Sequence, residues 1–136
     1  MSASLKPPAT RSLLVVDDEP SVRMIVRAIL SGAGFAVHEA ADPEAARSAL
    51  QSAARPFDVI VLDLTLPGEA GAALIPEFRA KSPGCRILLV SGAGADEAEG
   101  VDADAFLGKP FTRATLLDAV NKMLTAGGPG QPPAAG

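Results

Sequence analysis

The stretch that decides the fold is FDVIVLDLTLPG, residues 57–68. Its centre is a run of four apolar residues, 59–62, most of them β-branched. Such a run is typical of a strand that is buried on both faces, as in a parallel sheet. The run ends at one acidic residue, Asp63, and Pro67 and Gly68 then break the strand. Ligands bind at the carboxyl ends of strands in open α/β sheets, so Asp63 is the first candidate for a functional residue.

Four other segments have the character of strands, and two of them are also unbroken apolar runs. They are LLVV at 13–16, FAVHE at 35–39, ILLV at 87–90 and ADAFL at 103–107. Polar residues follow most of these strands. Asp17 and Asp18 come after the first, Ser91 comes after the fourth, and Lys109 comes shortly after the last. The sequence therefore places chemically active side chains where strands end.

Helical patterns separate the strands. Their expected starts are marked by Pro or by capping residues: Pro20, Asp42–Pro43, the segment after Gly71, and Thr112. The first helix is expected to pack through a single apolar face, formed by Val22, Ile25, Val26, Ile29 and Leu30. The segment between Ser91 and Lys109 has few apolar positions, so the sequence predicts only a short or irregular fourth helix near residues 95–100.

Strict alternation of strands and helices predicts an α/β fold with a five-stranded parallel sheet and helices on both faces. Right-handed crossovers place the carboxyl ends of all the strands at the same edge of such a sheet. Asp17, Asp18, Asp63, Ser91 and Lys109 are therefore expected to converge, although they are far apart in the sequence.

Composition limits the number of domains and the classes of function. A chain of 136 residues that is 48% hydrophobic fits one domain, expected at 12–125 between flexible segments at 1–11 and 126–136. A net charge of -4 without a basic stripe argues against direct binding of nucleic acid. No apolar run approaches the roughly 20 residues needed to span a membrane, and the start lacks a signal-peptide pattern. A single cysteine, Cys85, excludes an internal disulfide and fits a reducing, cytoplasmic location.

The converging residues suggest phosphoryl chemistry. Three carboxylates at one edge repel each other, and Mg²⁺, which prefers oxygen ligands, would relieve that repulsion. Asp63 could then act as a nucleophile and form an acyl phosphate. The Lys109 ammonium and the Ser91 hydroxyl would stabilise charge on the transferred group. Each residue alone has an ordinary interpretation as a helix cap, a loop lysine or a turn serine, so only the joint pattern favours this chemistry.

The motifs LLVVDDEP, VIVLDLTLPGEAG, ILLVSG and AFLGKPF resemble the receiver domain of two-component response regulators, including single-domain chemotaxis receivers. They occur in the same order and at compatible spacing over nearly the whole chain. The resemblance implies a flavodoxin-like sheet with the strand order 2-1-3-4-5. It also implies that Mg²⁺ is held directly by Asp18, Asp63 and the backbone carbonyl of Thr65, while Asp17 acts mostly through water.

The same resemblance implies a partner and a switch. A sensor histidine kinase or a phosphotransfer protein in a phosphorelay would donate the phosphoryl group to Asp63. Ser91 takes the position of the switch hydroxyl, Phe106 takes that of the switch aromatic residue, and Lys109–Pro110 matches a cis peptide. The chain is expected to change its surface for a protein partner, which the sequence does not identify. It is not expected to be an enzyme beyond transfer onto its own Asp63 and hydrolysis there.

Alternatives to a phosphorylated receiver remain at this point. The chain could be the receiver of a hybrid histidine kinase, or a scaffold that works without phosphorylation. A phosphatase of the haloacid dehalogenase type also forms an aspartyl phosphate, but it needs an acidic residue where this chain has Thr65. A flavin-binding module would need a phosphate loop after the first strand, where Asp17, Asp18 and Glu19 would repel the phosphate.

Overall fold

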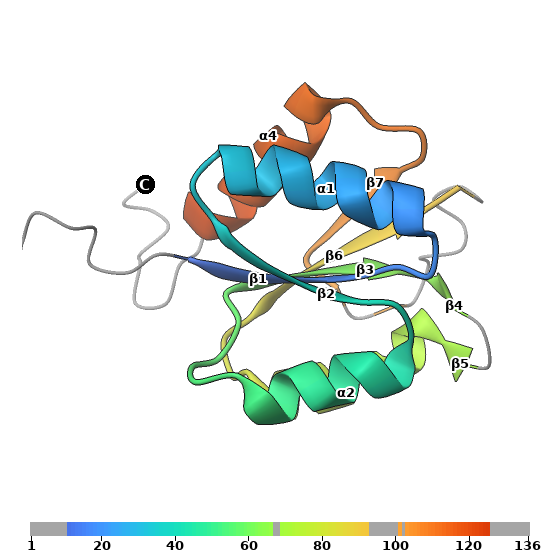
Figure 1. Ribbon diagram of the computed structural model, residues 1–136, viewed down its shortest axis with the longest axis vertical. Coiled ribbons are helices and arrows are strands. Elements are labelled where there is room, and N and C mark those ends of the chain that lie inside the picture. The colour runs from blue at the N-terminus through green and yellow to red at the C-terminus, as the bar shows by residue number, and fades with distance from the viewer. Residues whose placement is uncertain (1–10, 67–68, 93–100, 102, 126–136) are drawn as a thin grey trace, which may run out of the picture.

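The computed structural model describes residues 11–66, 69–92, 101 and 103–125. Its centre is a five-stranded parallel sheet with the order β2-β1-β3-β6-β7 (Figure 1). The strands are β1 (Ser12–Val16), β2 (Ala36–Ala40), β3 (Val59–Asp63), β6 (Arg86–Ser91) and β7 (Ala105–Gly108). Counted along the chain, these are the five predicted strands in the order 2-1-3-4-5. The predicted fold class and topology are therefore confirmed.

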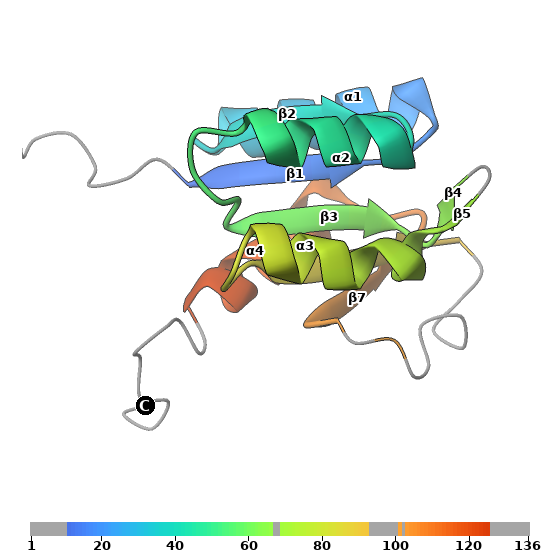
Figure 2. The ribbon, with the colours of Figure 1, turned by 90° about the horizontal axis from the view of Figure 1, so that it is seen from below.

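Four α-helices in the described residues cover both faces of the sheet. The helices α1 (Pro20–Gly32) and α4 (Arg113–Thr125) lie on one face, and α2 (Pro43–Ser52) and α3 (Ile75–Lys81) lie on the other (Figure 1). Figure 2 shows α2 and α3 side by side along the strands. None of these helices is long and apolar enough to cross a membrane. The fourth helix expected near 95–100 and the expected tail at 126–136 lie outside the described residues, as do residues 1–10 of the expected N-terminal segment.

The central strand β3 contributes to two hydrophobic cores, one on each face of the sheet. All five of its residues are buried, and successive side chains point to opposite faces of the sheet. The core beneath α2 and α3 includes Leu14, Ile60, Leu62, Leu74 and Phe78. The core beneath α1 and α4 includes Leu13, Val15, Val26, Leu30 and Leu116. Burying each such side chain contributes about 1.5–3 kcal/mol, so both cores stabilise the strand that carries the site.

The helix starts follow the expected capping chemistry. Asp42 Oδ1 accepts the backbone N–H of Ala45 at 2.7 Å, and Thr112 Oγ1 accepts that of Thr115 at 3.0 Å. Pro76 lies in the first turn of α3, where its missing N–H breaks no helical hydrogen bond. A 3-10 helix, η1 (Gly71–Leu74), precedes α3 and lets the α-helix begin late enough for this proline.

Two local features differ from the expectation. A short antiparallel pair follows Asp63, formed by β4 (Thr65–Leu66) and β5 (Glu69–Ala70). The last strand begins at Ala105, two residues later than expected. Asp104, the residue just before this strand, accepts the backbone N–H of Ile87 of β6 at 2.7 Å through its side-chain carboxylate. Neither contact has a local signature in the sequence.

The predicted apolar face of α1 was wrong for Ile25. This side chain is 53% exposed, whereas Val26 and Leu30 are fully buried. Ile25 lies on the flank of the helix and borders a hollow of about 350 Å³ instead of the core. The other residues that line the hollow are Val22, Lys109, Pro110 and Phe111. Helical spacing alone cannot distinguish a residue that faces the core from one that faces such a rim.

Candidate functional site

The predicted residues meet at the carboxyl edge of the sheet. Asp17 and Asp18 follow β1, Asp63 ends β3, Ser91 ends β6 and Lys109 follows β7. Because β1, β3, β6 and β7 pair in parallel as successive neighbours, their ends lie side by side. The topology thus produces the expected convergence from four separate parts of the chain.

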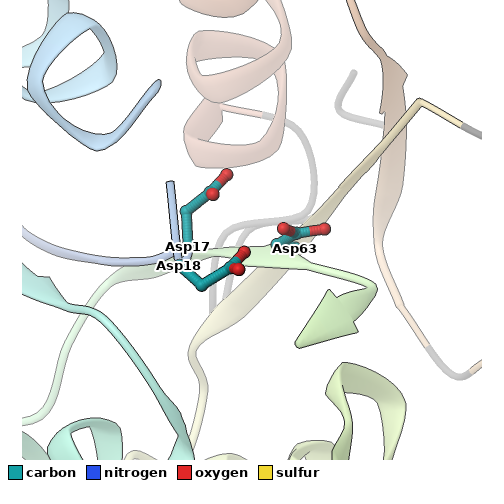
Figure 3. A group of neighbouring side chains, drawn as sticks. All are labelled: Asp17, Asp18 and Asp63. Carbon is teal, nitrogen blue, oxygen red and sulfur yellow. The ribbon is translucent and has the colours of Figure 1, made fainter. Parts of the chain in front are cut away.

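The three aspartates form a compact acidic cluster (Figure 3). One carboxylate oxygen of each lies within 4.8 Å of those of the other two. Asp17 and Asp63 are buried, with 4% and 5% of their surface exposed, whereas Asp18 is exposed. Burying two carboxylates this close together is unfavourable unless cations compensate them.

Lys109 supplies one compensating charge. Its Nζ lies 3.2 Å from Asp17 Oδ2, 3.6 Å from Asp63 Oδ2 and 3.5 Å from Glu19 Oε1. Burial lowers the pKa of this ammonium, but the negative charges of Asp17, Asp63 and Glu19 outweigh the burial and raise its pKa above the ordinary value. Lys109 therefore stays protonated at neutral pH, and one positive charge faces several carboxylates.

This charge imbalance and the donor atoms fit Mg²⁺, which takes oxygen ligands and retains several waters. Asp17 is already engaged, because its Oδ1 accepts the backbone N–H of Glu19 at 2.9 Å and its Oδ2 faces Lys109. The Asp18 carboxylate makes no hydrogen bond or ion pair to the part of the chain that the structure describes. It is therefore available as a ligand. Thr65 lies in β4, two residues beyond Asp63, and its carbonyl stays a predicted ligand.

Backbone hydrogen bonds between neighbouring strands hold the site in place. The N–H of Asp17 donates to the Ala40 carbonyl at 3.1 Å, and that of Lys109 donates to the Ser91 carbonyl at 2.9 Å. The peptide Lys109–Pro110 is cis, as the resemblance implied. Functional groups that are fixed in this way by regular structure need little rearrangement to act together.

The two predicted switch residues lie on adjacent strands. Ser91 is 2% exposed at the end of β6, and Phe106 lies on β7 opposite Leu89. Phe106 is only partly buried, and it packs against the core beneath α2 and α3. Its surroundings therefore differ from those of a static, fully enclosed aromatic residue. Their roles in switching stay predictions.

Two residues near the site were not among the candidates. Glu19 shares the Lys109 ammonium with the aspartates. Arg23 of α1 donates from Nη1 to the backbone carbonyl of Asp17 at 2.8 Å. Arg23 is not one of the residues that form the expected apolar face of its helix. Its contact depends on how α1 packs on the sheet, so no local motif could have identified it.

The family model described as the response regulator receiver domain matches residues 13–121. The chain is 37% identical over 127 residues to Protein PetR of Rhodobacter capsulatus. This alignment covers 91% of this chain and 51% of that protein. It is 35% identical over 117 residues to Sensor kinase CckA of Brucella abortus. That alignment covers 83% of this chain and 12% of the kinase. The chain thus spans about half, or far less, of the length of these relatives.

Solved structures resemble this chain over most of its length. The chemotaxis protein CheY4 of Vibrio cholerae has a TM-score of 0.77 and 32% identity, over 85% of this chain and 100% of that one. A response regulator protein from Burkholderia pseudomallei was solved with a phosphorylated aspartic acid, a calcium ion and citrate. It has a TM-score of 0.72 and 28% identity, over 83% of this chain and 68% of that one.

Proposed function

Because the chain belongs to the response regulator receiver domain family, we propose that it accepts a phosphoryl group on Asp63, with Mg²⁺ held by the neighbouring carboxylates. The position of Asp63 carries this proposal. Its carboxylate lies within 4.8 Å of those of Asp17 and Asp18 and 3.6 Å from the Lys109 ammonium. The phosphorylated aspartic acid and calcium ion in the Burkholderia pseudomallei structure give the proposal further support.

The proposed transfer begins with a phosphohistidine of a sensor histidine kinase or a phosphotransfer protein. A carboxylate oxygen of Asp63 attacks the phosphorus, the new P–O bond forms as the P–N bond breaks, and the imidazole leaves with the bonding electrons. Negative charge spreads over the three equatorial oxygens of the phosphoryl group during this step. The Lys109 ammonium is close enough to stabilise that charge. Mg²⁺, when bound by Asp18, Asp63 and the Thr65 carbonyl, would supply further positive charge.

The proposal includes a response to phosphorylation at the β6–β7 edge. The new phosphoryl oxygens accept a hydrogen bond from the Ser91 hydroxyl, and movement of Ser91 makes room for the Phe106 ring. The adjacency of β6 and β7 and the partial burial of Phe106 support this coupling. A local change of charge can bias such a surface between two packings and so alter its binding to a protein partner.

In this proposal the chain is a signalling receiver and not an enzyme acting on a separate substrate. The same role suits the receiver of a hybrid kinase, and the similarity to part of Sensor kinase CckA keeps that arrangement open. The complete acidic set argues against a scaffold that is never phosphorylated. We also propose a cytoplasmic location, which the single, buried Cys85 supports.

Incubation with acetyl phosphate and Mg²⁺ tests the proposed function directly. The mass of the intact chain is expected to increase by one phosphoryl group. EDTA is expected to prevent the gain, and hydroxylamine, which cleaves acyl phosphates, is expected to reverse it. The absence of any gain, or a gain that resists hydroxylamine, would contradict the formation of an aspartyl phosphate.

The exposed apolar rim beside the site is the proposed docking surface for the donor protein. Ile25 borders the hollow formed with Val22, Pro110 and Phe111, and Lys109 also lines it. Lys109 Nζ lies 3.6 Å from Asp63 Oδ2, so the hollow adjoins the carboxylate that a donor protein has to reach. A donor with an apolar surface around its phosphohistidine fits such a rim, because burial of apolar area favours association.

The variant Ile25→Ser is expected to slow transfer from a protein donor selectively. Truncation of a central apolar contact typically costs enough binding energy for a loss of about tenfold in kcat/KM. The measurement compares transfer from a purified histidine kinase that phosphorylates the wild type with transfer from acetyl phosphate. The small donor should react at the wild-type rate. Ala28→Ser, at an exposed position of the same helix, is the matched control. Equal loss with both donors would contradict a docking role.

A further inference from the structure

The side chain of Arg23 on α1 forms hydrogen bonds to β2 and to the backbone after β1, next to the acidic site. Its Nη1 donates to the Asp17 backbone carbonyl at 2.8 Å, and its Nε donates to Glu39 Oε1 on β2 at 3.1 Å. The side chain is only 18% exposed. Because the guanidinium is planar and its N–H directions are fixed, two bonds determine its orientation. Arg23 therefore links α1 and β2 to the backbone that follows β1.

The Asp17 carbonyl belongs to the peptide that joins Asp17 to Asp18. A peptide unit is planar, so a bond that holds this carbonyl also sets the direction in which the chain reaches the Cα of Asp18. The two aspartates differ in their other anchors. The Asp17 carboxylate is held by Glu19 and Lys109, whereas the Asp18 carboxylate has no such partner among the described residues. The position of the Asp18 carboxylate thus depends on its backbone.

From these contacts we infer that Arg23 is a positioning residue of the metal site. It holds the peptide between Asp17 and Asp18 so that the Asp18 carboxylate faces Asp63 across the space for the ion. This inference rests on the proposed function, since it assigns Arg23 to the same Mg²⁺ site. Arg23 acts through the backbone of Asp17 and is not itself a ligand.

Arg27 provides a natural control on the same helix. Its Nη1 lies 2.8 Å from Glu39 Oε2, so both arginines pair with the same carboxylate. Arg27 lies one turn further along α1, is 56% exposed in its side chain and has no hydrogen bond to Asp17. Replacement of Arg27 therefore removes a positive charge and an ion pair with Glu39, but leaves the bond to the Asp17 carbonyl intact.

Charge and positioning predict opposite effects on Mg²⁺ binding. Loss of a nearby positive charge alone would strengthen the binding of a cation, because like charges repel. Loss of a positioning contact would weaken it. Partners that orient metal ligands typically affect metal affinity by 10–100-fold, so Arg23→Gln is expected to raise the Kd for Mg²⁺ by about tenfold. Arg27→Gln is expected to change it by less than about twofold.

The test is a Mg²⁺ titration of the full chain, followed by the NMR shifts of backbone amides. The Asp18 amide of the metal-free protein is a second readout, and it should shift in Arg23→Gln and remain unchanged in Arg27→Gln. Arg23→Lys is the conservative variant, and it keeps the charge but lacks a fork that can bond two acceptors. Arg23→Lys is also expected to weaken Mg²⁺ binding. It replaces Arg23→Gln in the titration if Arg23→Gln does not fold.

The outcomes separate this inference from the proposed function. If the Arg23 variants bind Mg²⁺ as tightly as the wild type, or more tightly, the positioning role is wrong. Weakening of equal size in Arg27→Gln would also overturn it, because a general effect of the Glu39 ion pairs would then explain the result. Failure of the wild type itself to bind Mg²⁺ would instead refute the proposed metal site, and this inference with it.

Discussion

The variant Asp63→Asn is expected to lose all phosphoryl incorporation, whether the donor is acetyl phosphate or a histidine kinase. Asparagine has nearly the same shape, so the buried site at the end of β3 should stay folded. Its amide, however, carries no negative charge and is a far weaker nucleophile than a carboxylate. The same substitution also removes one of the three acidic groups that would hold Mg²⁺. Mass spectrometry of the intact chain measures the result.

A matched control lies at the other end of the same strand. Asp58 is partly exposed just before β3, and its Oδ2 accepts the backbone N–H of Ser12 at 2.8 Å. The variant Asp58→Asn should still gain one phosphoryl group, because Asp58 lies at the edge of the sheet opposite to Asp63. A phosphoryl group that persists in Asp63→Asn would show that another residue is the acceptor.

Replacement of Lys109 with methionine is expected to produce the second large loss. Methionine fills similar space but cannot stabilise the charge that develops on the phosphoryl oxygens. Removal of a single preorganised donor of this kind typically slows a reaction by about 10²–10³-fold. The rate of mass gain with acetyl phosphate and saturating Mg²⁺ measures this effect. A rate close to that of the wild type would exclude Lys109 from the chemistry.

The same variant should also change how Mg²⁺ affects stability. Without the Lys109 ammonium, Asp17 and Asp63 lose the cation that compensates their burial, and the metal-free protein should unfold at a lower temperature. Added Mg²⁺ supplies positive charge at the same place, so it should raise the unfolding temperature of Lys109→Met more than that of the wild type. Lys122→Met is the control, because Lys122 is 75% exposed and its ion pair within the described residues is with Asp118 on α4.

The parallel sheet and the convergence of polar residues could be predicted because they depend on patterns within short segments, whereas the strand order was implied only by the resemblance to receiver domains. The apolar runs at 13–16, 59–62 and 87–90 each lead into a polar residue, and the rules of parallel sheets bring those ends together. Asp63 is a candidate from its place at the end of the run 59–62 alone, without its contact with Lys109.

Contacts between distant elements could not be predicted in this way. Arg23 and Glu39 are separated by 16 positions, and their pairing depends on how α1 settles on β2. The exposure of Ile25 likewise depends on the path of the chain near Pro110, which leaves a hollow beside the helix. Helical spacing predicts which residues share a face, but the neighbouring elements decide whether that face is covered.

The burial of Asp63 affects which molecules can phosphorylate it. Its carboxylate is 5% exposed, while Asp18 beside it is open to solvent. Little of the Asp63 side chain is therefore open to a donor molecule. A phosphoryl group carried at the tip of an imidazole side chain, or on a molecule as small as acetyl phosphate, is expected to reach such a carboxylate. Donors that project the phosphoryl group from their surface are therefore expected to react faster than donors in which the group is recessed.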